Sequence, residues 1–231
     1  MTDDRLDDHC DQDWSHAPAV QPDAARWKTV RLPKPRDFQV AAPPANCSPE
    51  TLAELAELKE YARLLTEADM SQIWRWSTNE ESPLVHWAEV LDECCRRYKL
   101  SPPAGARLHA ALAESVYRSF IACWQQKWRY LRPRPTDLDP TLPTAIPVPR
   151  HPSYPSGHST VAAAAAAVLT QFFPDEAARW KGMAEEAGIA RLKAGIHYRS
   201  DHTAGLALGT EIATGILTAL AKDGGPKEYR L

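Results

Sequence analysis

Apolar side chains recur at helical spacing along most of the chain after residue 48. The clearest stripe lies within residues 102–130 and consists of Leu108, Leu112, Val116, Phe120, Trp124 and Trp128. Residues four apart lie on one face of a helix, so this segment predicts a long amphipathic helix. The sequence predicts further helices over about 49–67, 70–76, 83–98, 157–173, 175–194 and 200–222.

Serine–proline pairs mark the points where three of these helices should begin. Ser48-Pro49, Ser82-Pro83 and Ser101-Pro102 each place a capping hydroxyl before a proline that suits the first helical position. From Arg132 to Pro155 inclusive the chain has eight prolines, which predict a loop instead. No alternating, β-branched-rich segment and no internal repeat interrupts the pattern. The predicted fold is therefore all-α, a helical bundle.

The length and the proline pattern predict one domain with an arm. The 231 residues are enough to bury a substantial core. Residues 1–47 are acidic at first and then interrupted by prolines, which predicts an N-terminal arm that is disordered over residues 1–25. Residues 48–231 are expected to form a single all-helical domain.

Charge and cysteine usage narrow the environment of the protein. A formal net charge of -3 gives no basic bias, which argues against nucleic acid as the main partner. The five cysteines form an odd set without a Cys-x-x-Cys pair, as is typical of reduced thiols. There is no signal-peptide pattern, and no stretch approaches the roughly 20 apolar residues of a membrane-spanning helix. We expect a soluble, cytoplasmic protein without a membrane span, and a homo-oligomer is an open alternative to a monomer.

The first chemical motif is a cationic segment at the end of the long predicted helix. Lys127 and Arg134 lie seven residues apart in Lys-Trp-Arg-Tyr-Leu-Arg-Pro-Arg-Pro. A solvated basic patch is one interpretation, because the helix dipole favours cations at a C-terminus. Aromatic residues interleaved with basic ones are also typical of RNA-binding surfaces. A third interpretation, an anion site, depends on the motifs that follow.

The second motif, Pro-Ser-Gly-His at residues 155–158, leads into an alanine-rich predicted helix. Free amides and the helix dipole favour an anion at such an N-terminus. Gly157 would let the backbone approach the anion, Ser156 adds a hydroxyl donor, and His158 lies in the first turn. Taken alone, the same residues also fit a helix cap with an incidental histidine.

The third motif joins Arg191, His197 and Asp201. A histidine can act as a nucleophile or a ligand when one ring nitrogen is free and a carboxylate holds the other. Asp201, four residues after His197, is placed to hold it, although it could instead serve only to cap the last helix. His197, Asp201 and His202 also resemble a metal-ligand cluster. Cations in the same pocket would repel a metal ion, so no metal site is expected.

Together the three motifs describe a pocket for a tetrahedral oxyanion. Lys127, Arg134 and Arg191 supply positive charge, and Ser156 and Gly157 supply hydrogen-bond donors. Two histidines complete the set. A phosphoryl group needs charge neutralisation on its equatorial oxygens and reactive groups along its axis, and this set provides both.

The spacing of the motifs resembles a known superfamily. Lys-x6-Arg-Pro, Pro-Ser-Gly-His and Arg-x5-His-x3-Asp are similar to the pattern shared by type 2 phosphatidic acid phosphatases, bacterial non-specific acid phosphatases and vanadium haloperoxidases. The resemblance covers residues 105–222, and Ala190 departs from it where the family usually has serine. It implies a helical bundle of the acid phosphatase/vanadium haloperoxidase type.

The resemblance also implies a role for each matching residue. Lys127, Arg134 and Arg191 would bind the equatorial oxygens of phosphate or vanadate. Ser156 and the amide of Gly157 would complete that cradle. The missing serine at position 190 puts only a secondary contact in doubt.

Three further residues carry the implied chemistry. His197 would be the nucleophile that forms a phosphohistidine, or the axial ligand of vanadate. His158 would be the general acid that protonates the leaving oxygen, and Asp201 would orient His197. Trp124 and His151 resemble pocket positions of the vanadium haloperoxidases.

Three functions are compatible with these residues. The first is hydrolysis of a soluble small-molecule phosphate ester or pyrophosphate, with neither metal nor cofactor. The second is a vanadate-dependent haloperoxidase, which Trp124 and His151 favour and in which vanadate would be the cofactor. The third is a non-catalytic anion-binding protein. We favour the phosphatase, because phosphate esters are the commoner substrates of the superfamily and the chain is shorter than typical haloperoxidases.

Overall fold

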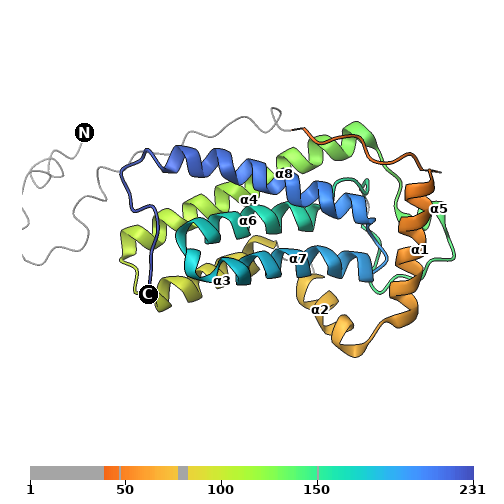
Figure 1. Ribbon diagram of the computed structural model, residues 1–231, viewed down its shortest axis with the longest axis horizontal. Coiled ribbons are helices and arrows are strands. Elements are labelled where there is room, and N and C mark those ends of the chain that lie inside the picture. The colour runs from red at the N-terminus through yellow and green to blue at the C-terminus, as the bar shows by residue number, and fades with distance from the viewer. Residues whose placement is uncertain (1–38, 47, 78–82, 150) are drawn as a thin grey trace, which may run out of the picture.

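The computed structural model describes residues 39–46, 48–77, 83–149 and 151–231 (Figure 1). Within these ranges the chain is helical and contains no strand, so the predicted all-α fold is confirmed. The helices are α1 (Pro49–Leu64), α2 (Glu67–Ser77), α3 (Pro83–Arg97), α4 (Pro102–Tyr130), α5 (Pro135–Leu138), α6 (Gly157–Phe172), the 3₁₀ turn η4 (Pro174–Glu176), α7 (Ala177–Lys193) and α8 (Arg199–Leu220).

The predicted helix boundaries hold with a few differences. The long helix α4 begins and ends as predicted, and Ser48 caps α1 by accepting a hydrogen bond from the amide of Thr51 at 3.2 Å. The one-turn helix α5 interrupts the segment predicted to be a loop. It begins at Pro135, which explains the difference: proline is disfavoured inside a helix but suits its first position.

Helix α6 lies at the centre of the bundle, between α4, α7 and α8 (Figure 1). Its alanines let the neighbouring helices approach closely, and Ala162, Ala164 and Ala165 are almost fully buried. Glycines of α8 bring the two backbones together. A Cβ at Gly209 would lie 2.0 Å from the carbonyl oxygen of Thr160, so only glycine fits there.

Most of the predicted N-terminal arm, including residues 1–25, lies outside the described residues. Residues 39–46 run beside the end of the bundle that carries the three motifs (Figure 1). Tyr130 donates a hydrogen bond to the carbonyl oxygen of Val40 at 2.7 Å, and Tyr154 donates one to that of Ala41 at 2.7 Å. The last part of the arm is therefore packed on the domain.

Helix α8 corrects one expectation from the sequence. It is 22 residues long, and its most apolar window has a mean hydropathy of 1.3, enough by length and composition to cross a membrane. The apolar stretch is inconspicuous in the sequence because the polar residues of its first turn precede it. Core helices of water-soluble proteins meet the same criteria, and 39% of this window is buried within the bundle.

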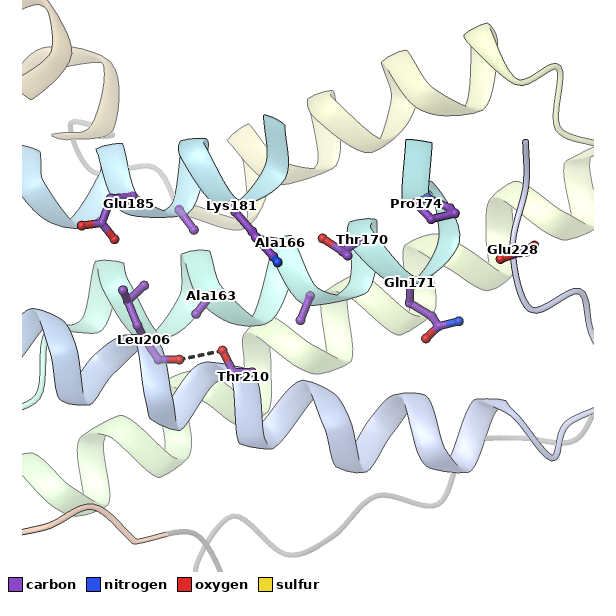
Figure 2. A pocket seen from close by; sticks show the side chains of 12 residues that line it. Ala163, Ala166, Thr170, Gln171, Pro174, Lys181, Glu185, Leu206, Thr210 and Glu228 are labelled. Carbon is purple, nitrogen blue, oxygen red and sulfur yellow. Dashed lines mark hydrogen bonds between the residues drawn. The ribbon is translucent and has the colours of Figure 1, made fainter. Parts of the chain in front are cut away.

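A groove of about 550 Å³ runs along the side of the bundle between α6, α7 and α8. Figure 2 shows Lys181 and Glu185 of α7 on one wall and Leu206 and Thr210 of α8 on the other. Its floor is formed by alanines of α6. None of the residues that the sequence predicts for the anion site lines this groove.

Candidate active site

His197 and Asp201 form a hydrogen-bonded pair at the start of α8. The Nδ1 atom of His197 lies 2.8 Å from Oδ2 of Asp201, and both residues are buried. The same carboxylate oxygen accepts the amide of Tyr198 at 3.1 Å, which caps the helix. Asp201 therefore caps α8 and orients His197 at once, so the two interpretations from the sequence are compatible.

The carboxylate of Asp201 has two further donors. The hydroxyl of Ser153 donates to Oδ2 at 2.5 Å, and Nη1 of Arg132 donates to Oδ1 at 2.8 Å. Burial alone would raise the pKa of Asp201. The hydrogen bond from His197, together with the charge of Arg132 and the hydrogen bond from Ser153, outweighs burial and holds the pKa of Asp201 well below its usual range. Asp201 is thus a fixed anion.

The protonation of the His197 ring follows from its neighbours. Nη1 of Arg134 lies 3.1 Å from Nε2, and an arginine can only donate. Nε2 is therefore the acceptor, and Nδ1 carries the proton that Asp201 accepts. Burial and the charge of Arg134 lower the pKa of His197 well below its usual value, against the opposing effect of Asp201. The ring is neutral, with a lone pair on Nε2.

Lys127 and Arg134 are buried cations whose hydrogen bonds go mainly to backbone carbonyls. The ammonium of Lys127 donates to the carbonyl oxygens of Pro152 and Ser153 at 2.7 and 2.8 Å. Arg134 donates to those of His151 and Ile196 at 3.0 and 2.6 Å. Carbonyls orient the two groups but leave their charge unneutralised, which favours a bound anion.

Burial lowers the pKa of both cations. The pKa of Lys127 falls to about 8 and that of Arg134 to about 10, with burial the main cause in each case. A lowered pKa in a cation measures the cost of holding its charge away from water. An anion that entered the pocket would offset that cost.

Arg191 and His158 form the other side of the site. Arg191, in the last turn of α7, is 1% exposed and donates to the carbonyl oxygen of Ile73 at 2.7 Å and the hydroxyl of Ser77 at 3.2 Å. Burial and the charge of Arg191 lower the pKa of His158 to about 3. Nε of Arg191 and Nε2 of His158 are buried without a hydrogen-bond partner within the part of the chain that the structure describes.

Ser156 and Gly157 start α6, as predicted. Ser156 is the N-cap, and its hydroxyl accepts the amide of Ser159 at 3.3 Å. A Cβ at Gly157 would lie 3.5 Å from the ring of Trp124, in ordinary contact. The cap interpretation therefore describes the contact of Ser156 in this structure, and its role in an anion cradle remains a prediction.

Trp124 and His151 lie beside these groups. Their ring centroids are 4.9 Å apart, and Nδ1 of His151 lies 3.1 Å from Nη2 of Arg134. The ammonium of Lys127 lies 5.9 Å from the Trp124 ring centroid. Burial and the two cations lower the pKa of His151 to about 4, so its ring is neutral near pH 7.

The structure thus brings the predicted residues to one end of the bundle but in two groups. His197, Asp201, Arg134 and His151 form one hydrogen-bonded chain. Arg191 forms the second group with His158: it is hydrogen-bonded to α2, and its charge lowers the pKa of His158. Within the described residues, no cluster of three His, Cys, Asp or Glu side chains could hold a metal ion.

Four residues whose side chains or carbonyls hold Asp201 and Arg191 from elsewhere in the chain were not predicted. Arg132 and Ser153 bind Asp201, and both lie inside or beside the three sequence motifs. Ile73 and Ser77 bind Arg191 from α2, which carries no recognisable motif. The first two could have been suspected from their positions, whereas nothing in the sequence indicated the other two.

Comparison with known proteins agrees with this architecture. The PAP2 superfamily model matches residues 106–224, more than half of the chain. The chain is 38% identical over 88 residues to a lipid A 1-phosphatase of Rhizobium johnstonii, covering 34% of this chain and 36% of that protein. It is 27% identical over 155 residues to an acid phosphatase of Zymomonas mobilis, covering 64% of this chain and 57% of that protein.

A solved structure shares the fold. The crystal structure of a bacterial vanadium-dependent iodoperoxidase superposes with a TM-score of 0.71 at 24% identity, over 80% of this chain and 53% of that one. The chain therefore spans 53% of this structure, 36% of the lipid A 1-phosphatase and 57% of the acid phosphatase. The family match, the helical bundle and the three motifs lead to one conclusion: the chain belongs to the PAP2 superfamily.

Proposed function

We propose that this protein is a phosphatase that hydrolyses a soluble phosphate ester in the cytoplasm, through a phosphohistidine and without a metal ion. The proposal rests on one observation: a neutral His197 with a lone pair on Nε2 lies beside the buried cations Lys127 and Arg134. The names of the lipid A 1-phosphatase and the acid phosphatase support a phosphate ester as the substrate class.

Substrate binding would exchange one contact of the site. The N–H of Arg134 that now points at Nε2 of His197 would turn to an equatorial oxygen of the phosphoryl group. Lys127 and the unpartnered Nε of Arg191 would neutralise further oxygens. Charge-assisted hydrogen bonds of this kind are strongest where water is excluded, as it is around these buried groups.

The first chemical step would transfer the phosphoryl group to His197. Its Nε2 lone pair forms a bond to phosphorus while the bond from phosphorus to the ester oxygen breaks. His158, protonated when the substrate is bound, gives its proton to the leaving oxygen. Asp201 stabilises the positive charge that develops on the His197 ring.

The second step would return the enzyme to its starting state. Water attacks phosphorus while the bond to Nε2 breaks, and its electron pair returns to the ring of His197. His158, now neutral, takes a proton from the attacking water as a general base. Inorganic phosphate then leaves and His158 releases its proton to water, while the proton on Nδ1 of His197 has stayed on the ring, hydrogen-bonded to Asp201, throughout.

The test is turnover of an aryl phosphate between pH 4 and 8 in the presence of a chelator. We expect activity that the chelator does not reduce, and a loss of at least about 10⁴-fold in kcat for His197→Ala. Inorganic phosphate binding, measured by calorimetry, should persist in the variant. Absence of turnover by the wild-type protein with several aryl and alkyl phosphates would contradict the proposal.

A vanadate-dependent haloperoxidase is the second candidate, favoured by the Trp124–His151 pair beside Arg134. The cradle proposed for phosphate also fits vanadate, because its buried cations and the two unpartnered nitrogens of Arg191 and His158 suit either oxyanion. Lys127, Arg134, Arg191 and His197 would hold it. Vanadate, when bound, supplies Lewis-acid activation of hydrogen peroxide. Oxidation of bromide or iodide by vanadate-loaded protein tests this candidate.

The third candidate, an anion-binding protein without catalytic activity, is distinguished from the two enzymes by the phosphatase and halide-oxidation assays. It predicts that phosphate binds in calorimetry while no ester and no halide is turned over. The fixed tautomer of His197 argues against it, since binding alone needs no oriented lone pair.

A further inference from the structure

Arg132 is a buried cation that the three motifs do not use. It lies between Lys127 and Arg134 in the sequence, and its side chain is 1% exposed. Nη1 donates to Oδ1 of Asp201 at 2.8 Å, and Nη2 donates to Oε2 of Glu54 in α1 at 2.9 Å. The guanidinium carbon lies 3.9 Å from the ring centroid of Tyr198.

The partners of Arg132 separate it from the other cations of the site. Lys127 and Arg134 donate to carbonyl oxygens and keep their charge available, whereas Arg132 binds two carboxylates. A guanidinium that is already paired with Glu54 and Asp201 has little charge to offer an incoming anion. Any effect of Arg132 on the reaction must therefore act through Asp201.

The charges around His197 make that effect specific. Lys127 of α4 and Arg134 of the following loop oppose a positive charge on the ring, and Asp201 of α8 favours one. Arg132 faces the other oxygen of the same carboxylate. Without Arg132, the negative charge of Asp201 would act on His197 with no arginine bound to the carboxylate to offset it.

We propose that Arg132 is a positioning residue that fixes the carboxylate of Asp201 against His197 and offsets its charge there. This inference rests on the proposed phosphatase function for its consequence in turnover. It concerns the ring of His197 itself, however, and so it can be tested in protein that turns nothing over.

The consequence for turnover lies in the second chemical step. When the bond from Nε2 to phosphorus breaks, the electron pair returns to the ring and the ring loses its positive charge. An uncompensated Asp201 stabilises the charged, phosphorylated ring more than the neutral product. By offsetting that charge, Arg132 keeps the phosphohistidine reactive toward water.

The main experiment is an NMR titration of ¹⁵N-labelled histidine in the wild-type protein, Arg132→Met and Arg132→Lys. We expect the pKa of His197 to rise by about one unit or more in Arg132→Met, because an opposite charge then acts without compensation. Arg132→Lys keeps the charge and should return the pKa most of the way to the wild-type value. An unchanged pKa in folded Arg132→Met overturns the proposal.

Glu54→Gln is the matched control. It removes the other carboxylate partner of Arg132 but leaves the bond to Asp201, so the pKa of His197 should stay at or below the wild-type value. The double variant Arg132→Met/Glu54→Gln removes the unpaired Glu54 as a second source of charge, and the rise should persist there. If Arg132→Met fails to fold, Arg132→Lys and Glu54→Gln still decide: a rise of a unit in either contradicts the proposal.

Turnover supplies a separate readout. In Arg132→Met the acid limb of kcat/KM should move to higher pH, and phosphoenzyme trapped by an alkaline quench should accumulate during steady state. An inactive wild-type protein contradicts the proposed function but leaves the titration valid. An active protein whose His197 titrates alike with and without Arg132 contradicts only this inference.

Discussion

The two histidines of the site lie in opposite surroundings. His197 donates from Nδ1 to Asp201 and accepts at Nε2 from Arg134, so both of its ring nitrogens are engaged. His158 has an Nε2 that is buried without a partner among the described residues, and it faces the charge of Arg191. The His197 ring is held at both nitrogens, whereas the His158 ring has a nitrogen without a hydrogen-bond partner among the described residues.

The difference follows from the elements that hold each ring. His197 is fixed by Asp201, four residues later in the chain. Ser153 of the loop before α6 also contacts His197, and Arg132 of the segment after α4 binds Asp201. The surroundings of His158 come from α2 and α7, which are distant in sequence. A nucleophile needs one oriented lone pair, whereas an acid in this pocket needs an anion to keep its proton.

Replacing Asp201 by Asn should have the largest effect on the His197 side. The amide can donate to Nδ1, which would move the ring proton to Nε2 and block the lone pair. We expect kcat to fall by about 10²–10⁴-fold with little change in the affinity for phosphate. Steady-state kinetics and calorimetry check this, with Ser153→Ala as a milder control. Activity within tenfold of wild type would show that the tautomer does not matter.

Replacing His158 by Ala should have an effect that depends on the leaving group. Alkyl phosphates should lose about 10²–10⁴-fold in kcat, because a poor leaving group needs the proton. Nitrophenyl phosphate, whose leaving group is stable as an anion, should lose far less. The slope of log kcat against leaving-group pKa measures this difference. An equal loss for all esters would instead assign His158 to binding.

Lys127 tests the charge that both histidines share, since it lowers the pKa of each. Its own pKa of about 8 means that the ammonium is lost as the pH rises through that value. Affinity for tungstate should therefore fall by up to about tenfold per pH unit above 8. Lys127→Arg should bind without this fall, and Lys127→Met should bind weakly at every pH. A wild-type affinity that stays constant to pH 10 would refute the assignment.

The smallest expected signal is a proton taken up by His158 when an anion binds. Its pKa of about 3 leaves the free ring neutral at pH 6, and a dianion would offset the charges of Arg191 and Lys127 that help to lower it. Calorimetry of tungstate binding in buffers of different ionisation enthalpy should show uptake of up to about one proton. His158→Asn should show less. Equal uptake in the variant would place the proton elsewhere.

The sequence determined the local part of this protein. The four-residue apolar repeat and the proline at position 102 were enough to place α4, because periodicity and the preference of proline for the first helical position act within a few residues. The spacing of His197 and Asp201 was likewise enough to predict their contact. Such relations join residues at most four positions apart in the chain.

Only the tertiary structure decided which partner each cation takes. Arg132 and Arg134 are two residues apart and chemically identical, yet one binds carboxylates and the other binds His197 and carbonyls. Arg191 is held by Ile73 and Ser77 of α2, more than a hundred residues away. A long arginine side chain can reach many different hydrogen-bond acceptors, and the packing of α1, α2 and α8 determines which of them it binds.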